Sequence, residues 1–260
     1  MALRQLYLIE KNKKRCKNAG IMTNEGFLLV NKPAGITSHD VMDRIRRITG
    51  IRKVGHAGTL DPFATGLLII GVGRSAAREM QALQGLDKAY EALFVLGASS
   101  DTDDKEGKIT QKICTKDITN ESIDHSLKDF LGTIEQIPPM YAAIKVKGKK
   151  LYELAREGKT IERKAREVTI YNYQRTSDPV AHESTYKISF SITCSTGTYI
   201  RALARDLGEK FGGGGYVEAL ERTSISHISL KNAQTLEEIK ERGWESLLID
   251  VEHLKQQLSE

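Results

Sequence analysis

The chain has 260 residues, which is enough for one large domain or for one domain with a small appendage. Its composition, 40% hydrophobic and 28% charged, is typical of a globular protein, and no apolar run approaches the roughly 18 residues that span a bilayer. The three cysteines are scattered and form neither a disulfide framework nor a metal-ligand cluster. We therefore expect a cytoplasmic protein in a reducing environment, with no membrane segment and no metal.

The formal net charge of +5 is unevenly distributed. Residues 1–24 hold six basic residues and one acidic residue, and the remainder of the chain is neutral, with 33 of each sign. Within that remainder, the segment 145–166 has nine basic and three acidic residues, whereas 231–260 has four and seven. A neutral body with one basic segment fits a protein that grips phosphate on a single face, although a solvated charged loop fits the charge pattern equally well.

Hydrophobic periodicity and turn residues predict a mixture of strands and helices. In chain order, we expect a strand at 27–30, a helix capped by Ser38 and stopped by Gly50, strands at 66–72 and 90–96, helices at 121–131 and 151–157, strands at 168–173 and 185–193, a helix at 199–211, and a short helix that begins with a capping box at Thr235. The elements do not alternate regularly as βαβ units. This favours the α+β class with a largely antiparallel sheet.

Asp61 lies in a loop of small residues between the first helix and the strand at 66–72. Taken alone, an aspartate before a proline is typical of a turn. Here Gly55 and Gly58 permit a close approach of backbone or of a planar base, and Pro62 stiffens the backbone directly after Asp61. The pattern indicates a carboxylate held on a braced loop.

Six stretches of the chain, taken in order, carry a resemblance to a known family. They are Leu29-Val30-Asn31-Lys32-Pro33-Ala34-Gly35, Gly55-His56-Ala57-Gly58-Thr59-Leu60-Asp61-Pro62-Phe63-Ala64-Thr65-Gly66, Asp87-Lys88-Ala89-Tyr90, Gln136-Ile137-Pro138-Pro139-Met140-Tyr141, Lys147-Gly148-Lys149-Lys150-Leu151-Tyr152-Glu153 and Cys194-Ser195-Thr196-Gly197-Thr198-Tyr199-Ile200-Arg201. Together they resemble the TruB-type tRNA pseudouridine synthases, over about residues 26–223.

The resemblance implies a fold and a division of the chain. The fold is the pseudouridine synthase fold, a mixed, largely antiparallel sheet flanked by helices, formed by a catalytic domain at 25–230 with an RNA-binding insertion near 140–166. Residues 1–24 are expected to form a mobile basic extension. Bacterial members often end with an RNA-binding domain of the PUA kind, and the segment 231–260 is too short for one, so we expect a short helical remnant there.

The implied activity is the isomerisation of uridine to pseudouridine at position 55, in the TΨC stem-loop of tRNA. This reaction breaks the C1′–N1 bond and forms a C1′–C5 bond without redox change, so it requires no cofactor and no metal. It needs a carboxylate, and Asp61 is the candidate. Whether Asp61 attacks as a nucleophile or acts as a base stays open, as does the order of proton transfers.

The family pattern also assigns roles around Asp61. Arg201 matches an arginine that pairs with the catalytic carboxylate, and an adjacent cation lowers a carboxylate pKa. Tyr90 matches an aromatic residue that stacks on the displaced uracil and takes part in proton transfer. The remaining expected substrate contacts are His56, Tyr199, Leu220 and Lys32. Because the uridine of a folded loop must be extruded, we also expect base flipping.

The sequence departs from the family pattern at two positions besides its C-terminus. Ala142 stands where serine is usual, and Glu221-Arg222 replaces a pair of basic residues, which is expected to weaken the basic surface near Leu220. The absence of a PUA domain favours a stand-alone bacterial enzyme, a monomer that uses no guide RNA. The alternative is a non-catalytic RNA-binding or RNA-folding protein on a synthase scaffold, which predicts damage to Asp61, Tyr90 or Arg201; all three are present.

Overall fold

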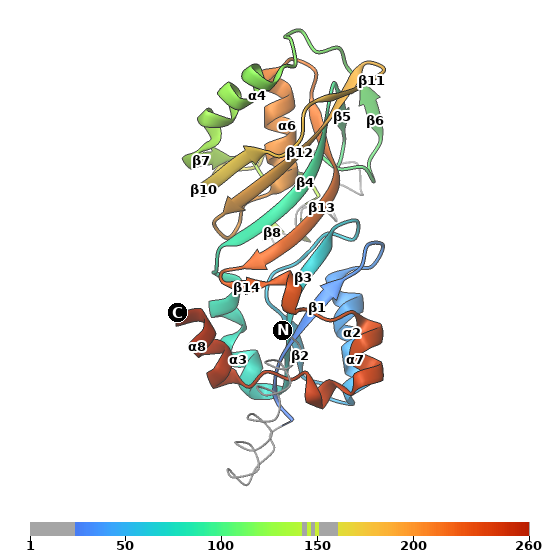
Figure 1. Ribbon diagram of the computed structural model, residues 1–260, viewed down its shortest axis with the longest axis vertical. Helices are drawn as coiled ribbons and strands as arrows, with labels where there is room; N and C mark the ends of the chain where they lie inside the picture. Colours follow the sequence, from blue (N-terminus) through green and yellow to red (C-terminus); the bar gives the residue numbers. More distant parts are fainter. Residues whose placement is uncertain (1–23, 142–144, 147–148, 151–160, 260) are drawn as a thin grey trace.

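The computed structural model describes residues 24–141, 145–146, 149–150 and 161–259 (Figure 1). Its strands are β1 (Gly26–Lys32), β2 (Val54–His56), β3 (Thr65–Val72), β4 (Lys88–Leu96), β5 (Ala98–Ser100), β6 (Ile109–Gln111), β7 (Gly132–Gln136), β8 (Lys145–Val146), β9 (Lys149–Lys150), β10 (Arg166–Arg175), β11 (Val180–His182), β12 (Thr185–Cys194), β13 (Gly215–Ile225) and β14 (Ile228–Ser229). Its helices are α2 (Ser38–Thr49), α3 (Gly73–Gln84), α4 (Asn120–Leu127), α6 (Ile200–Lys210), α7 (Leu236–Arg242) and α8 (Val251–Ser259), with 3-10 turns η1 (Lys128–Phe130), η2 (Leu230–Asn232) and η3 (Trp244–Ser246).

The main sheet of the described chain runs in the order β1-β3-β13-β4-β12-β10-β7, with β2, β11 and β14 paired alongside. Every pair in it is antiparallel except β3 with β13. The helices lie beside this sheet (Figure 1). The expected α+β class with a mixed, largely antiparallel sheet is therefore confirmed.

One half of the molecule is built on β4, β12, β10 and most of β13. The alternation of buried and partly exposed residues along β12 places one face of this half toward α4 and α6. Phe94, Tyr173 and Phe190 meet there, the last two with ring centroids 5.4 Å apart. Three residues of the loop around Asp61, namely Leu60, Phe63 and Ala64, are buried in the same cluster. The loop is thus anchored in the core of this half.

The other half is built on β1 and β3, whose two faces are both covered. Helices α2 and α7 cover one face, where Leu28, Val30 and Leu68 are buried, and α3 and α8 cover the opposite face. Ile239 of α7 and Trp244 of η3 belong to the first of these clusters. The C-terminal segment, expected as a remnant, therefore completes the core of this half.

Helix α2 shows how local sequence sets an element's bounds. Thr37, and not Ser38 as expected, is its N-cap, in a reciprocal capping box with Asp40. Gly50, in the left-handed conformation at φ 72°, ends the helix as expected. The prediction of Ser38 as the cap was wrong because its hydroxyl is used elsewhere, on the backbone of Leu60.

The prediction differs from the structure at further elements, and strands β7 and β13 and helix α8 were not predicted. The helix expected at 121–131 is shorter, because its last turn tightens into η1. Helix α3 was not predicted, since it begins at a glycine with no side-chain cap; instead the Glu25 carboxylate accepts from the Ser75 N–H in its first turn. The helix expected at 151–157 and the N-terminal extension, apart from residue 24, lie outside the described residues.

Candidate functional site

The loop that carries Asp61 joins β2 to β3 at a fork in the sheet. One edge of β3 pairs with β1 along its length. The other edge pairs with β13 at Thr65–Gly66 and with β2 at Ile70–Val72. The loop between His56 and Thr65 therefore emerges where β13 leaves β3, at the junction of the two halves.

Two side chains hold this loop from the β1–α2 side. The Ser38 hydroxyl accepts from the Leu60 N–H at 2.9 Å and donates to the Leu60 carbonyl at 3.0 Å. The Lys32 ammonium donates to the carbonyls of Pro33, Ile36 and Pro62 at 2.9, 2.7 and 3.2 Å. The backbone on both sides of Asp61 is thereby fixed before any substrate arrives.

The structure corrects the expectation for Lys32. It lies near the site, but its side chain is fully buried and all three ammonium donors are used on carbonyl oxygens. Burial lowers the pKa of Lys32 to about 8. Lys32 therefore braces the loop, and its ammonium is not free to contact RNA.

Arg222 of β13 holds the loop from the opposite side. Its Nε donates to the Leu67 carbonyl at 2.8 Å, and its Nη2 and Nη1 donate to the carbonyls of Gly58 and Thr59 at 3.1 and 3.5 Å. The loop packs directly on this guanidinium: a Cβ at Gly58, whose φ is 92°, would lie 3.6 Å from Nη1. Arg222 is 1% exposed, so it contributes no charge to the surface near Leu220, where Glu221-Arg222 was expected to weaken the basic surface.

Asp61 and Arg201 form an ion pair with two contacts. Arg201, in the first turn of α6, places Nε 3.0 Å from one carboxylate oxygen of Asp61, and its Nη2 donates to the other at 3.1 Å. Such two-point contact fixes the orientation of a carboxylate as well as its charge. One third of the Asp61 side chain remains exposed, whereas that of Arg201 is 5% exposed.

A second carboxylate shares the same arginine. Arg201 Nη1 donates to Asp104 at 3.1 Å and to the Thr102 carbonyl at 3.0 Å, and the side chain of Asp104 is 5% exposed. Burial raises the pKa of Asp61. The charge of Arg201 lowers this pKa, that of Asp104 raises it, and that of Lys32 lowers it. The pKa of Asp61 is raised overall. Arg201 does lower it, as expected, but burial and Asp104 together outweigh the effect of Arg201.

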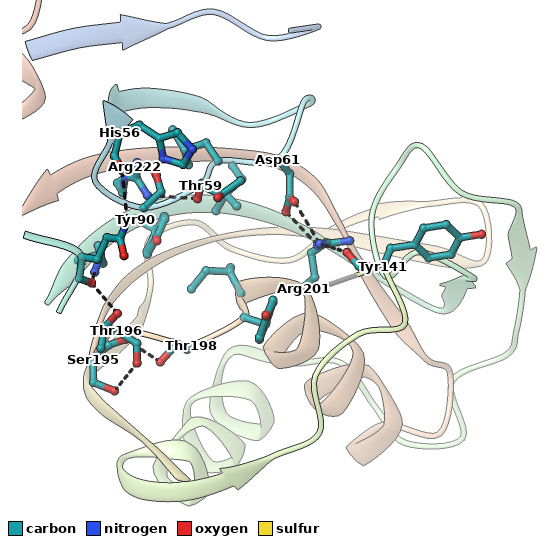
Figure 2. A pocket seen from close by; sticks show the side chains of 18 residues that line it. His56, Thr59, Asp61, Tyr90, Tyr141, Ser195, Thr196, Thr198, Arg201 and Arg222 are labelled. Atoms are coloured by element: carbon teal, nitrogen blue, oxygen red, sulfur yellow. Dashed lines mark hydrogen bonds and ion pairs between the residues drawn. The ribbon is translucent and has the colours of Figure 1, made fainter. Parts of the chain in front are cut away.

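A cavity of about 380 Å³ opens beside this ion pair. Figure 2 shows Asp61 and Arg201 facing each other at one end, and Arg222, His56 and Tyr90 grouped at the other. The predicted site residues Asp61, Arg201, Tyr90, His56, Tyr199 and Leu220 all line it. Lys32 is the one expected site residue that does not.

Tyr90, Leu220 and Tyr199 come to the cavity from three elements. Tyr90 of β4 and Leu220 of β13 lie on neighbouring strands and are 8% and 7% exposed. Tyr199, the N-cap residue of α6, is held by the buried carboxamide of Gln136, which accepts from its N–H at 2.8 Å and donates to its carbonyl at 3.1 Å. Gln136 thus fixes both Tyr199 and the start of the helix that carries Arg201.

The cavity end near Tyr90 carries further polar groups. His56 ends β2, and burial and the charge of Arg222 lower its pKa; within the described residues its Nδ1 has no hydrogen-bond partner. Lys88 donates to the carbonyls of Gln84 and Leu86, and burial lowers its pKa to about 8. Burial also raises the pKa of the Tyr90 hydroxyl, against the opposing effect of Arg222.

Four residues that shape the site were missed by the sequence reasoning: Asp104, Arg222, Gln136 and Ser38. A signal existed for Arg222, because residues two apart on a strand share a face and Leu220 was already placed in the pocket. For Asp104 no such signal exists, since nothing in the acidic run 101–107 indicates which carboxylate turns inward. The basic segment 145–166 lies largely outside the described residues, apart from the pair β8–β9 and residues 161–166.

The described part of the chain contains no candidate metal cluster and no membrane-spanning helix. No group of three or more His, Cys, Asp or Glu side chains there could hold a metal ion. Within the same residues, none of the helices combines the length and apolar character needed to cross a bilayer.

Known proteins resemble this chain over most of its length. A family model described as TruB family pseudouridylate synthase (N terminal domain) matches residues 46–200. The tRNA pseudouridine synthase B of Mycobacterium bovis is 43% identical over 228 residues, which cover 88% of this chain and 76% of the relative. The protein of the same name from Thermobifida fusca is 44% identical, covering 83% and 74%. That from Streptococcus agalactiae is 42% identical, covering 84% and 74%.

Among solved structures, a chain from the crystal structure of a Cbf5-Nop10-Gar1 complex aligns with a TM-score of 0.65 and 26% identity. The alignment covers 89% of this chain and 62% of that one, which is therefore considerably longer. Sequence and fold thus agree. The chain belongs to the TruB family of pseudouridylate synthases.

Proposed function

We propose that the protein isomerises uridine to pseudouridine in tRNA, at position 55 of the TΨC loop, with Asp61 as its catalytic carboxylate. The observation that carries this is the paired but partly open carboxylate: Asp61 is held at two points by Arg201, yet a third of its side chain faces a cavity lined by Tyr90 and Tyr199. The curated relatives that share 42–44% identity with the chain are named tRNA pseudouridine synthase B.

The geometry suits the chemistry of this isomerisation. The C1′–N1 bond breaks and the base departs with the bonding electron pair; C5 then bonds to C1′ and loses its proton, while N1 gains one, so the product is an isomer of the substrate. The ionised Asp61 lies where it can serve at C1′, either as the nucleophile or as the base that starts the cleavage. Tyr90 offers a ring for stacking and a hydroxyl for proton transfer.

The substrate must enter the cavity by extrusion from the tRNA loop. Extrusion costs a few kcal/mol, which stacking on Tyr90 and contacts of the basic segment 145–166 with phosphates would offset. His56, Tyr199 and Leu220 complete the proposed base pocket. We further propose that the protein acts in the cytoplasm as a monomer, without a cofactor and without a guide RNA.

One assay tests the proposal. Purified protein is incubated with an unmodified tRNA transcript and no added RNA or metal, and pseudouridine is mapped by position, in parallel with Asp61→Asn. We expect conversion at position 55 alone, lost by at least about 10⁴-fold in the variant, as for other essential catalytic groups. Equal conversion by the variant would contradict the assignment of Asp61.

Two further outcomes of the assay would change the function itself. Tight binding of tRNA with no conversion by the wild-type protein would favour the RNA-binding alternative. Conversion that appears only in a second reaction supplied with guide RNA would contradict the stand-alone enzyme.

A further inference from the structure

Arg222 is a buried cation without a carboxylate partner. Its side chain is among the largest that are fully buried, and it donates to three backbone carbonyls. No ion pair between Arg222 and an Asp or Glu occurs within the described residues, whereas Arg201 is paired with two carboxylates. A buried charge without a counter-charge is costly, and its persistence at a cavity points to a function.

The charge of Arg222 acts on the groups around it. It lowers the pKa of Lys88 and of His56, in each case adding to the effect of burial, and it opposes the burial that raises the pKa of Tyr90. Lys88 carries a second cation to the same end of the cavity, with its Cε 3.9 Å from where a Cβ of Gly58 would lie. The cavity is therefore polarised, with Asp61 at one end and fixed positive charge at the other (Figure 2).

This polarity matches the charge that develops in the proposed reaction, on which the inference rests. When the C1′–N1 bond breaks, the electron pair leaves on the base and spreads over N1, O2 and O4, while C1′ becomes electron-poor. An electron-poor C1′ is stabilised beside Asp61, and an electron-rich uracil is stabilised beside a fixed cation. Preorganised charges aimed at developing charge supply a large share of catalytic rate in many enzymes.

We propose that Arg222 is a positioning residue that also stabilises, through the loop carbonyls, Tyr90 and the local field, the negative charge of the departing uracil. It acts from beneath the loop that carries Asp61. Its three hydrogen bonds keep the guanidinium in place, and its charge lowers the barrier to cleavage. A residue that only braced the loop would affect every substrate equally.

The experiment separates charge from bracing with two variants and two substrates. Arg222→Gln keeps an amide donor and loses the charge, whereas Arg222→Lys keeps the charge and loses the planar guanidinium with its several N–H donors. Each is assayed in single turnover on a tRNA transcript with uridine, and on one with 5-fluorouridine, at position 55. The fluorine withdraws electrons and stabilises the departing base by itself. Arg175→Gln, at a paired arginine on β10 outside the cavity, is the matched control.

We expect Arg222→Gln to lose about 100-fold in the rate of uridine consumption, the loss typical of one preorganised donor, with the Kd for tRNA unchanged. On 5-fluorouridine the loss should shrink to about tenfold or less, and Arg222→Lys should stay within about tenfold of wild type. An equal loss of rate on both substrates would overturn the proposal, as would an Arg222→Lys variant as impaired as Arg222→Gln. Either result would mean that Arg222 only supports the loop that carries Asp61.

Stability and function are read separately. Thermal unfolding is measured for each variant, and if Arg222→Gln does not fold, the pH dependence of Arg222→Lys decides. A lysine buried there should lose its proton at a lower pH than an exposed lysine, as burial lowers the pKa of the neighbouring Lys88. The rate of the variant should therefore fall as the pH rises, while the rate of wild type does not. Parallel profiles would overturn the proposal. No conversion of either substrate by wild type would instead contradict the proposed function itself.

Discussion

The two ends of the cavity use arginine in opposite ways. At one end Arg201 lies between Asp61 and Asp104, so that one cation meets two carboxylates. At the other, Arg222 donates to backbone carbonyls and lies beside the Tyr90 hydroxyl, and within the described residues it pairs with no carboxylate. Both side chains are almost fully buried. Burial therefore does not decide the electrostatic character of an end; the partners do.

The different partners of Arg201 and Arg222 suit two different functions in the site. Around Arg201 the charges are compensated and the geometry is fixed by ionic contacts, which suits the orientation of a nucleophile or base. Around Arg222 the charge is left uncompensated, which suits the stabilisation of an anion that exists only during the reaction. Substitutions that disturb the paired charges around Arg201 or the unpaired charge of Arg222, one at a time, can test these two functions.

The largest effect is expected from Arg201→Met. Removing the cation leaves Asp61 and Asp104 without the counter-charge that they share, and breaking a buried ion pair typically costs about 3–5 kcal/mol of stability. Activity should fall at least about 10³-fold, because Asp61 also loses its orientation. Single-turnover kinetics and thermal unfolding check the two parts. Arg205→Met, which removes the neighbouring arginine paired with Asp103, is the control and should retain more activity.

The next prediction concerns the pH at which activity is lost in acid. The reaction needs ionised Asp61, and because burial raises the pKa of Asp61, the rate should fall at a pH above that expected for an ordinary aspartate. Asp104 contributes to that rise in pKa. In the pH–rate profile of Asp104→Asn, the acid limb, where the rate falls, should therefore lie at lower pH than in wild type, whatever the maximal rate of the variant. Asp124→Asn, at a surface ion pair, should leave the limb in place. An upward move in Asp104→Asn would contradict the electrostatic account.

The sequence predicted the end of the cavity that contains Asp61 better than the end that contains Arg222. Asp61 and Arg201 stand in local motifs, and their meeting at one cavity was implied by the resemblance. At the other end His56 and Tyr90 were expected, but Arg222 was not. The strands at 66–72 and 90–96 were likewise predicted, because continuous or alternating apolar patterns are local signals. Where pattern and tertiary contact agree, the sequence suffices.

The remainder depends on long-range contacts that no local pattern contains. Ser38 was taken for a helix cap because its type fits, but the hydroxyl is used 22 residues away on Leu60. Lys32 was taken for an RNA contact because exposed cations bind phosphate, and the role of Arg222 was not foreseen. Both are buried, since β1 and β13 flank the loop and bring their side chains beneath it. The burial of a cation becomes known only with the fold.

A smaller effect on activity is expected from Gln136→Leu. The carboxamide makes two hydrogen bonds to the backbone of Tyr199, and leucine of similar size makes neither. The turnover rate should fall about tenfold through the displacement of Tyr199 and of the start of α6, which carries Arg201 at the compensated end, while the Kd for tRNA stays within about twofold. Gln136→Glu keeps one acceptor and should recover part of the rate. A loss confined to tRNA affinity would show that Gln136 serves binding instead.

The smallest effect on activity should come from the half of the molecule that holds neither arginine. Ile239 of α7 is fully buried against α2, and Ile239→Ala should lower the free energy of unfolding by about 2–5 kcal/mol through lost packing. At a temperature where the variant stays folded, its single-turnover rate should equal that of wild type, because none of the buried residues clustered with Ile239 lines the cavity. Denaturant titration and kinetics on one preparation check both parts. A stable variant that has lost activity would show that the two halves are coupled, and that the contrast between the two ends is set by the whole fold and not by the partners of each arginine.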